Sequence, residues 1–452
     1  MKKFLLSALF LFLFLSQFTI QANSELSAEE LRREFSSHGV VPLFTLKHKT
    51  YSAEKFELGR LLFFDKILSG NKNISCAACH HSHFGSGDEL PLSIGEGGEG
   101  LGKKRELKAG HLIPRNAPPI FNRGFDDYHT VMWDGRIRKG EKPGTWQTPE
   151  AGINGENPEF AHVVEPLESI LAVQALFPIS SEHEMLGAFQ TNEVSRETDR
   201  DYMWMRLRER ILKIERYRDL LFKAYPEVKE SSDFNFGHIA NAVGAFEAEA
   251  FRADRTDFDY FLAGKKELTK REMRGAQLFL NKGACISCHN GPFLSDFDNH
   301  ALAVPQMGPG KEEAVNDRGL ELQTKNPMDR YKFKTPTLRN VELTGPWMHD
   351  GYFTNLKEVI KHHVNAQSSL LKHISSKNHQ KHKQLFIKTL DRDFERNRER
   401  MSFLSPKLAS LPRFSEDEIH DLYLFLLTLT DRSFKERVKN PLSVPSGLSV
   451  DK

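Results

Sequence analysis

The sequence predicts a mainly α-helical fold built from two related domains. Residues 76–80 and 285–289 share the pattern Cys-x-x-Cys-His. Each motif follows a segment in which a glycine precedes an apolar run, at 59–65 and at 275–281. This weak internal repeat indicates that a helix leads into a similar loop twice. No alternation of apolar and polar residues persists for long, so we expect few strands.

The Cys-x-x-Cys-His pattern is the attachment signature of a c-type haem. Two thiols at this spacing can form thioether bonds to one porphyrin, and the adjacent histidine then becomes an axial ligand of the iron. The chain has four cysteines, and the two motifs contain all of them. The expected attachment residues are Cys76, Cys79, His80, Cys285, Cys288 and His289. A zinc site of four cysteines and a redox-active dithiol are alternatives, but a histidine after both pairs favours two haems.

Length and charge agree with an exported protein of two domains. A chain of 452 residues is long for one domain. The formal charge is only +2, so no bulk electrostatic argument points to nucleic acid. The sequence predicts a signal peptide over 1–22. This segment has two lysines at its start, then a short apolar run, and a small residue, Ala22, at its end. A membrane anchor is the alternative, but the run is short for a span. We therefore expect a periplasmic protein.

The remaining segments are assigned from helical spacing and composition. We expect helices over 28–37, 201–225 and 236–251, with the N-terminal domain at 23–235 and the C-terminal domain at 236–452. The glycine-rich residues 87–110 should form a loop around a haem edge. Residues 371–413 are dense in lysine, histidine and arginine. They predict a solvated helical insertion or a docking surface for an acidic electron-transfer partner.

Several further motifs occur in an order that is specific to one family. They lie at residues 58–65, 115–119, 132–136, 184–187, 334–340 and 346–351. With the two haem motifs, they make residues 53–430 resemble the bacterial dihaem cytochrome c peroxidases and their MauG-type relatives. The resemblance implies a mainly α fold of two cytochrome c-like haem domains packed face to face, with a calcium ion between them.

The resemblance also implies roles for the two haems and for the residues near them. His80 would be the proximal ligand of the N-terminal haem, where peroxide reacts. His289 would be the proximal ligand of the C-terminal haem, which relays electrons. Trp133 matches the tryptophan between the two haems. Glu184 matches the distal glutamate, a carboxylate able to move the proton that cleavage of the O–O bond requires, and Gln174 fits the same pocket.

Three oxygen ligands of the family's calcium site have counterparts here. Asn116 would bind through its side chain, and Thr344 and Pro346 through their backbone carbonyls. Calcium accepts such mixtures of amide and carbonyl oxygens, although a simple turn would explain the same residues.

The chain departs from the family pattern after the first haem motif. Family peroxidases that need reductive activation carry a distal histidine in this loop, and here Glu96 stands in its place. We expect Glu96 to point away and leave an open site, and weak ligation is the alternative. Replacement ligands could come from His81, His83 or His111. An open site requires no reductive activation, which resembles the MauG-type enzymes.

The far-side ligand of the second haem departs as well. The family places methionine or tyrosine at the position of His363, and we expect His363 to ligate, with His362 second and Met348 as another alternative. Two imidazoles give a lower potential than histidine with methionine, because a thioether favours ferrous iron. His349 should bond a haem propionate.

The expected activity is reduction of hydrogen peroxide to water with electrons from a small cytochrome c or cupredoxin. A MauG-like enzyme that oxidises residues of a partner protein is the first alternative. A dihaem electron carrier without catalysis is the second. Relatives are often dimers, so a homodimer is possible, and no nucleic acid is expected.

Overall fold

The computed structural model describes residues 25–156, 161–312, 315–375 and 384–451. The expected signal peptide lies outside these residues. The helices are α2 Ala28–Ser37, α3 Ala53–Phe64, α4 Cys76–Cys79, α5 Ala161–Val164, α6 Ile170–Ala175, α7 Arg200–Leu212, α8 Glu215–Ala224, α9 Phe236–Ala250, α10 Asp257–Leu262, α11 Lys270–Leu280, α12 Glu321–Thr324, α13 Leu356–Val364, α14 Ala366–Ser375, α15 Gln384–Ile387, α16 Phe394–Ser402, α17 Pro406–Ala409, α18 Glu416–Leu427 and α19 Phe434–Arg437.

Strands are short in the described ranges, which confirms the mainly α fold. They are β1 Thr130–Val131, β2 Ile137–Lys139, β3 Trp146–Gln147, β4 Asn299–Ala301 and β5 Lys332–Lys334. The first three form an antiparallel sheet, and β4 pairs with β5. Over the same described residues, no helix has the length and apolar character needed to cross a bilayer.

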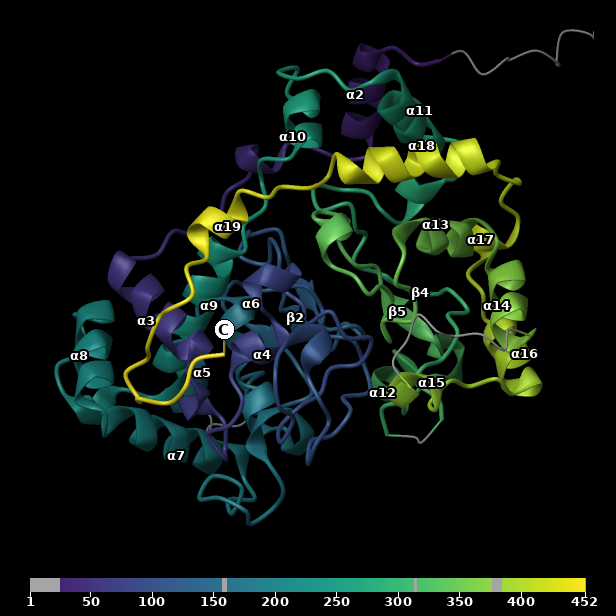
Figure 1. Cartoon of the computed structure of the whole chain (residues 1–452). Helices are drawn as coiled ribbons and strands as arrows, with labels where there is room; N and C mark the ends of the chain where they lie inside the picture. The colour runs from purple at the N-terminus through teal and green to yellow at the C-terminus, as the bar shows by residue number, and fades with distance from the viewer. Residues whose placement is uncertain (1–24, 157–160, 313–314, 376–383, 452) are drawn as a thin grey trace, which may run out of the picture.

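The N-terminal unit is organised around α9, which packs against α3 and α6 (Figure 1). Phe63 and Phe246 meet in this core with ring centroids 5.1 Å apart, and both side chains are fully buried. The tail beyond α18 runs back over the same unit, where α19 contacts α9. Apolar residues from both ends of the chain therefore stabilise one core.

The C-terminal unit is organised around α11 and α18, with α2 beside them at the top of Figure 1. Phe35 of α2 lies 5.8 Å from Phe425 of α18, and Phe279 of α11 lies 5.3 Å from the same ring. A capping box between Ser27 and Glu30 begins α2. The expected helix over 28–37 is confirmed, but it belongs to the second core.

The hydrophobic cores do not follow the expected boundary between residues 235 and 236. Helix α9 begins at this point and is buried in the first core, whereas α2 belongs to the second. A single boundary in the sequence cannot place α2 in the second core and α9 in the first. The apolar face of a helix shows that the helix packs, but not against which distant segment.

The internal repeat corresponds to two similar helix crossings. A Cβ atom on Gly59 of α3 would lie 1.8 Å from the carbonyl oxygen of Ala242. A Cβ atom on Gly275 of α11 would lie 2.0 Å from the carbonyl oxygen of Asp421. Each haem motif thus follows a helix whose glycine allows close contact with another helix of its unit.

We expected one helix over 201–225, but the structure has two helices there, α7 and α8. The expectation of a continuous helix is therefore wrong. The chain turns at Lys213 and Ile214, where Ile214 is extended. The turn lets α7 contact α9 while α8 contacts α3. Tyr217 then reaches Asp65 with a buried hydrogen bond of 2.6 Å. Helix α9 confirms the helix expected over 236–251 to within one residue, and residues 87–110 form a loop with one short turn at Gly102–Lys104. The position of this loop at a haem edge stays a prediction.

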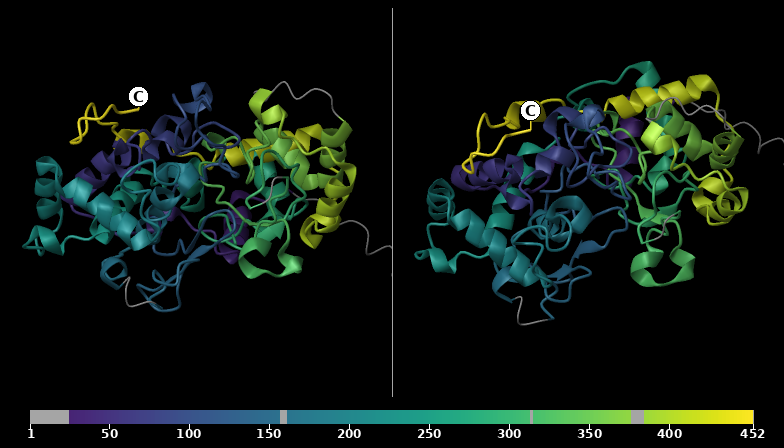
Figure 2. Two further views of the ribbon diagram at one scale, coloured as in Figure 1. Left: turned by 90° about the horizontal axis from the view of Figure 1, so that it is seen from below. Right: turned by 60° about the horizontal axis from the view of Figure 1, so that its bottom comes forward.

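A third, smaller core joins the two units, which lie side by side in both views of Figure 2. It combines Leu90, Leu92 and Ile94 with Val304, Met307, Tyr352, Phe353 and Phe386. Beside it, Arg115 donates two hydrogen bonds to Asp317, at 2.7 and 2.8 Å, and one of 2.7 Å to Asp134. The joint is therefore both apolar and ionic.

Candidate active site

Each Cys-x-x-Cys-His motif lines its own large cavity. The first cavity encloses about 1,680 Å³ of empty space and is lined by Cys76, Cys79 and His80. The second encloses about 1,720 Å³ and is lined by Cys285, Cys288 and His289. Because the two pairs line different cavities, the alternative of one zinc site with four cysteines is wrong.

The cysteines are free of disulfide bonds, and three of them are poor nucleophiles in this environment. Burial raises the pKa of the Cys79 and Cys285 thiols to about 12, and it raises the pKa of Cys76 further. A reactive dithiol needs a lowered thiol pKa. These thiols therefore do not fit the redox-dithiol alternative.

Both motif histidines are prepared to bind a metal through Nε2. His80 Nδ1 lies 3.1 Å from the carbonyl oxygen of Ser86, and His289 Nδ1 lies 2.9 Å from that of Leu294. A carbonyl only accepts, so each Nδ1 carries the proton and each Nε2 keeps its lone pair. Burial lowers the pKa of both histidines to about 4, which keeps them neutral. Such a hydrogen bond also fixes the ring orientation.

The first cavity collects the predicted catalytic residues. Glu184 lies in a π-helical turn over 182–186, and Gln174 lies on α6, and both line the cavity. Burial raises the pKa of Glu184, partly offset by Arg136, Lys311 and His183. Gln174 Oε1 accepts a hydrogen bond from Arg123 Nη1. A proton-accepting carboxyl and an oriented amide therefore share one cavity with His80.

Glu96 is turned away from the first cavity. Its Oε1 accepts hydrogen bonds from Asn71 Nδ2 at 2.9 Å and from Asn73 Nδ2 at 2.5 Å. Its backbone N–H donates to the carbonyl oxygens of His183 and Glu184, at 3.2 and 3.1 Å. The loop at Glu96 therefore supports the turn that carries Glu184 without placing a carboxylate in the cavity.

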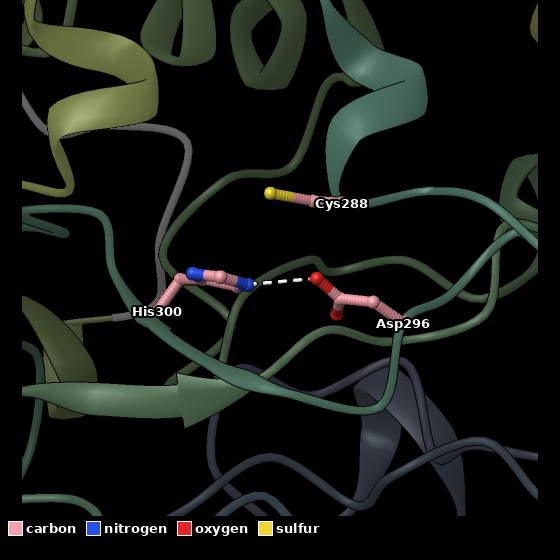
Figure 3. Close-up of side chains that lie close together, drawn as sticks. All are labelled: Cys288, Asp296 and His300. Atoms are coloured by element: carbon pink, nitrogen blue, oxygen red, sulfur yellow. Dashed lines mark hydrogen bonds and ion pairs between the residues drawn. The ribbon is translucent and has the colours of Figure 1, made fainter.

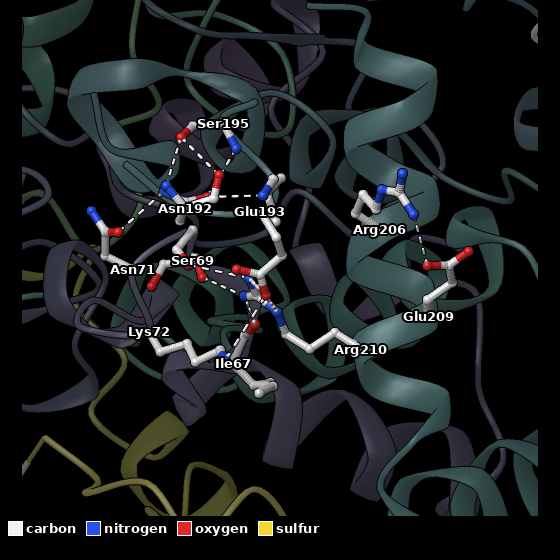
Figure 4. Close-up of polar contacts among 12 residues, drawn as sticks. Ile67, Ser69, Asn71, Lys72, Asn192, Glu193, Ser195, Arg206, Glu209 and Arg210 are labelled. Atoms are coloured by element: carbon white, nitrogen blue, oxygen red, sulfur yellow. Dashed lines mark hydrogen bonds and ion pairs between the residues drawn. The ribbon is translucent and has the colours of Figure 1, made fainter. Parts of the chain in front are cut away.

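A polar network joins residues 67–72 to residues 192–195 and to Arg210 (Figure 4). Arg210 donates to the carbonyl oxygens of Ile67 and Ser69, at 2.8 and 2.7 Å. Asn192 donates to Asn71 Oδ1 at 3.2 Å and to the carbonyl of Leu186 at 2.9 Å. Asn71 is thus fixed on one side by Asn192 and bonds Glu96 on the other.

The three replacement ligands considered for the first haem lie elsewhere. His81 is buried outside the cavity lining, and its Nδ1 accepts from the backbone N–H of His83. His111 is exposed and stacks on His183, with ring centroids 4.4 Å apart. None of the three lines the first cavity.

Trp133 and Asn116 line both cavities. Trp133 Nε1 donates to the carbonyl oxygen of Asn116 at 2.9 Å. The backbone N–H of Asn116 donates to the carbonyl oxygen of His349 at 2.7 Å, and His349 lines the second cavity. The predicted bridging tryptophan therefore lies in the wall between the two sites.

The candidate far-side ligands of the second haem differ in whether they line the second cavity. His363 lines it, and its Nδ1 lies 2.8 Å from the carbonyl oxygen of Val359, which leaves Nε2 free. His362 does not line it, because its Nε2 donates to the carbonyl oxygen of Leu302 at 2.8 Å. Met348 also lines the cavity. The geometry thus admits His363 and Met348 but not His362.

Comparison with known proteins agrees with this geometry. Residues 53–267 match the sequence model of the family described as di-haem cytochrome c peroxidase. The chain resembles this family over that range. It is 28% identical to the cytochrome c551 peroxidase of Pseudomonas aeruginosa over 323 residues, which cover 71% of this chain and 75% of that protein.

Two further relatives represent the MauG branch. The chain is 26% identical to the methylamine utilization protein MauG of Methylophilus methylotrophus over 315 residues, 69% of this chain and 72% of that protein. A crystal structure of a MauG-like protein associated with microbial copper homeostasis superposes with a TM-score of 0.59 at 26% identity, covering 89% and 96% of the two chains. Members of the di-haem peroxidase family thus include both kinds of enzyme.

The residues present fit the two c-type haems of a di-haem peroxidase. Each cavity has two thiols and a histidine with a free Nε2. The second cavity also has a buried His349 Nε2 with no hydrogen-bond partner, which fits an acceptor supplied from within the cavity. The expected propionate contact of His349 therefore has an available donor.

Cys288, Asp296 and His300 form a cluster that resembles a metal site (Figure 3). Their ligand atoms lie within 4.8 Å of one another, and His300 Nε2 lies 2.9 Å from Asp296 Oδ2. The predicted haem attachment at Cys288, however, would place its sulfur in a thioether bond. The cluster then consists of an ion pair beside the second haem, in which Asp296 raises the pKa of His300.

The proposed calcium ligands lie together at the second cavity. Asn116, Thr344 and Pro346 all line it. Asn116 Nδ2 donates to the carbonyl oxygens of Leu90 and Pro91, at 2.8 and 3.2 Å, so its Oδ1 is the atom left for a cation. Calcium at this position stays a prediction.

Sequence reasoning missed two buried residues near the first haem site. Glu247 of α9 lines the first cavity, and burial raises its pKa to about 8. Arg123 is 4% exposed and binds Gln174. A glutamate within an apolar helical run was the available signal for Glu247, because a carboxyl rarely occupies a buried face without a role.

Proposed function

We propose that this protein reduces hydrogen peroxide to water, using two electrons from an external carrier and two protons. One observation supports this proposal above the others. Glu184 and Gln174 line the cavity of His80, whereas the Glu96 carboxylate is bonded to Asn71 and Asn73 outside it. The distal side of the first haem then offers a peroxide both space and a proton-transfer group.

Glu184 is the residue that moves the proton. The carboxylate accepts a proton from one peroxide oxygen and delivers it to the other as the O–O bond breaks. Burial raises its pKa, so both protonation states are closer in energy than for an exposed glutamate. Arg123 orients Gln174, which binds the peroxide through its amide.

The haem iron attached through Cys76 and Cys79 supplies the redox chemistry at peroxide. His80 holds its Nδ1–H on Ser86 and so presents Nε2 toward the cavity in one orientation. Trp133, in the wall between the cavities, provides the path for electrons from the second site. His289 and His363, which line the second cavity with their Nε2 atoms free, would hold the second haem.

A MauG-like oxidation of a partner protein is the second candidate. It is favoured by the position of Glu96, since a site without a distal histidine needs no reduction before peroxide binds. The identity to the MauG protein named above, 26%, is close to the 28% for the peroxidase. A dihaem electron carrier without catalysis is less favoured, because it has no use for Glu184 in the first cavity.

The location of the protein, its electron donor, its calcium ion and its oligomeric state are proposed from the sequence alone. The signal-like segment over 1–22 supports export to the periplasm, where a small cytochrome c or cupredoxin is the electron donor. A calcium ion on Asn116, Thr344 and Pro346 and a homodimeric state complete the proposal.

The test is electron paramagnetic resonance of the diferric holoprotein before and after one equivalent of peroxide. A high-spin signal that disappears without prior reduction supports an open first site. Turnover of peroxide with a reduced c-type cytochrome then supports the peroxidase. A covalent mass change in a partner protein without such turnover supports the MauG-like alternative. Two low-spin signals unaffected by peroxide in the resting and half-reduced forms contradict both.

A further inference from the structure

One corner of the second cavity brings together polar residues that are distant in sequence. The polar residues that line this corner are Gln306, Asp317, His349 and Arg400. The backbone N–H of Asp317 donates to Gln306 Oε1 at 3.2 Å, and that of Asp391 donates to the Gln306 carbonyl at 3.0 Å. Arg115 neutralises Asp317 with two hydrogen bonds. The corner is therefore built at the joint between the two units.

Arg400 is the only contribution of α16 to this cavity lining. Its side chain is 2% exposed, and its Nη2 donates to Asp391 Oδ2 at 2.7 Å. Its Nη1 donates to Asn397 Oδ1 at 2.9 Å. Its Nε is buried and has no hydrogen-bond partner. A guanidinium donor left unpaired in a protein interior is costly, because charged donors lose strong bonds to water.

The two arginines that bind Asp391 differ in their exposure to water. Asp391 binds two guanidinium groups, because Arg396 donates to its two oxygens at 3.0 and 2.7 Å. Arg396 also pairs with Asp393, at 3.9 Å. Arg396 is 38% exposed and reaches water, whereas Arg400 is enclosed and faces the cavity. Of the two guanidinium groups, Arg400 is therefore the one on the side of the second cavity.

His349 contributes a second unpaired donor to the same corner. Its side chain is buried, and its ring lies parallel to Phe333 with centroids 3.7 Å apart. Its Nε2 is buried without a partner. Burial, which Asp317 opposes and the charges of Arg115 and Arg400 assist, lowers the pKa of His349 to about 3, so the ring is neutral. A neutral ring with a proton on Nε2 is a hydrogen-bond donor into the corner.

We propose that Arg400 and His349 form a clamp for a carboxylate, and that this carboxylate is a propionate of the haem attached at Cys285 and Cys288. The inference rests on the two-haem assignment under the proposed function and extends it. A carboxylate satisfies both unpaired donors and forms a charge-assisted hydrogen bond with Arg400. It also gives the segment around α16 a role, since this segment supplies the cation that neutralises the second haem.

The clamp should change the midpoint potential of the second haem, a property that can be measured without an activity assay. A buried cation beside a propionate removes net negative charge near the iron and so favours the ferrous state. Replacement of Arg400 by a neutral residue therefore lowers the midpoint potential of the second haem. The first haem, which belongs to the other cavity, keeps its potential.

The experiment is a spectroelectrochemical titration of holoprotein variants whose haem content has been measured. Arg400→Gln is compared with Arg396→Gln, which removes the same charge from the same helix and the same Asp391 but lies outside the cavity lining. We expect a downward shift of the second midpoint in Arg400→Gln, with the first midpoint unchanged, and no comparable shift in Arg396→Gln. Equal shifts in the two variants overturn the clamp.

A second measurement covers the case in which Arg400→Gln does not assemble. Resonance Raman spectra of the wild type and His349→Gln report hydrogen bonding to the propionates through their bending modes. The clamp requires a shift of one propionate mode in His349→Gln, and identical spectra overturn it. Failure of the proposed function is separate, because it appears as a wild type with two haems that does not react with peroxide.

Discussion

Trp133 donates its indole N–H to the backbone carbonyl of Asn116 at 2.9 Å, and the same two residues line both cavities. Asn116 comes from the loop after the first haem motif, and its own N–H bonds the carbonyl of His349 in the C-terminal unit. The wall between the two sites is thus one hydrogen-bonded layer. These two hydrogen bonds join the N-terminal and C-terminal units between the two cavities.

Trp133→Phe keeps a buried aromatic ring but removes the donor to Asn116. Leaving that carbonyl unpaired costs about 1–3 kcal/mol of stability. We expect peroxide-driven oxidation of the reduced second centre to slow by about tenfold or more, equivalent to about 1.4 kcal/mol in the barrier. Stopped-flow absorbance measures this rate. Trp146→Phe is the control, because Trp146 is buried but lines neither cavity.

Glu184→Gln tests the proton-transfer role directly. The amide preserves size but cannot accept the peroxide proton, so we expect the rate of the peroxide reaction to fall by about 10²–10⁴-fold. In the wild type this rate should rise with pH through a pKa above the ordinary glutamate value, because burial raises it and the carboxylate is the active form. The pH dependence should disappear in the variant. A rate within threefold of wild type contradicts the role.

Glu96→Gln tests whether the loop carboxylate matters to the iron. Since Glu96 is bonded to Asn71 and Asn73 away from the cavity, we expect the absorption spectrum and the peroxide rate to change by no more than about twofold. Glu96→His restores the residue type of relatives that need reductive activation. If Glu96→Gln alone converts the first haem to a different spin state, the carboxylate is a ligand and the open-site reading fails.

His363→Met tests the far-side ligand of the second haem. A thioether favours ferrous iron, so the midpoint potential of the second haem should rise. His362→Met is the control variant. It leaves the Leu302 carbonyl unpaired and costs about 1–3 kcal/mol of stability, but the midpoint potential of the second haem should not change. Potentiometry with optical detection separates the two effects. An unchanged potential in His363→Met would instead point to Met348.

Arg115→Leu tests the ionic joint between the units. It leaves Asp317 buried without its two hydrogen bonds, so we expect a loss of about 3–5 kcal/mol in denaturant unfolding. Burial would raise the pKa of Asp134 and Asp317, but Arg115 holds both below their usual range. Their stabilisation is complete above the unfolded pKa of about 3.9 and is lost as pH falls through the folded values. The acid transition of Arg115→Leu should therefore be less steep below about pH 4.

The sequence by itself determined the chemistry of attachment and much of the local structure. Cys-x-x-Cys-His is decided by residues that are adjacent along the chain, and so is the capping box that begins α2 at Ser27. The helices over 28–37 and 236–250 likewise follow from local periodicity and capping. Such features need no distant partner, and the sequence therefore predicts them.

Only the tertiary structure decided which residues meet. It placed α2 in the second core and α9 in the first, broke the helix at Ile214, and turned Glu96 toward Asn71 and Asn73. It also brought Arg400 to the second cavity and Glu247 to the first. These outcomes depend on contacts between residues that are distant in sequence and on which polar atoms become buried. The spacing of neighbouring residues does not determine either of these.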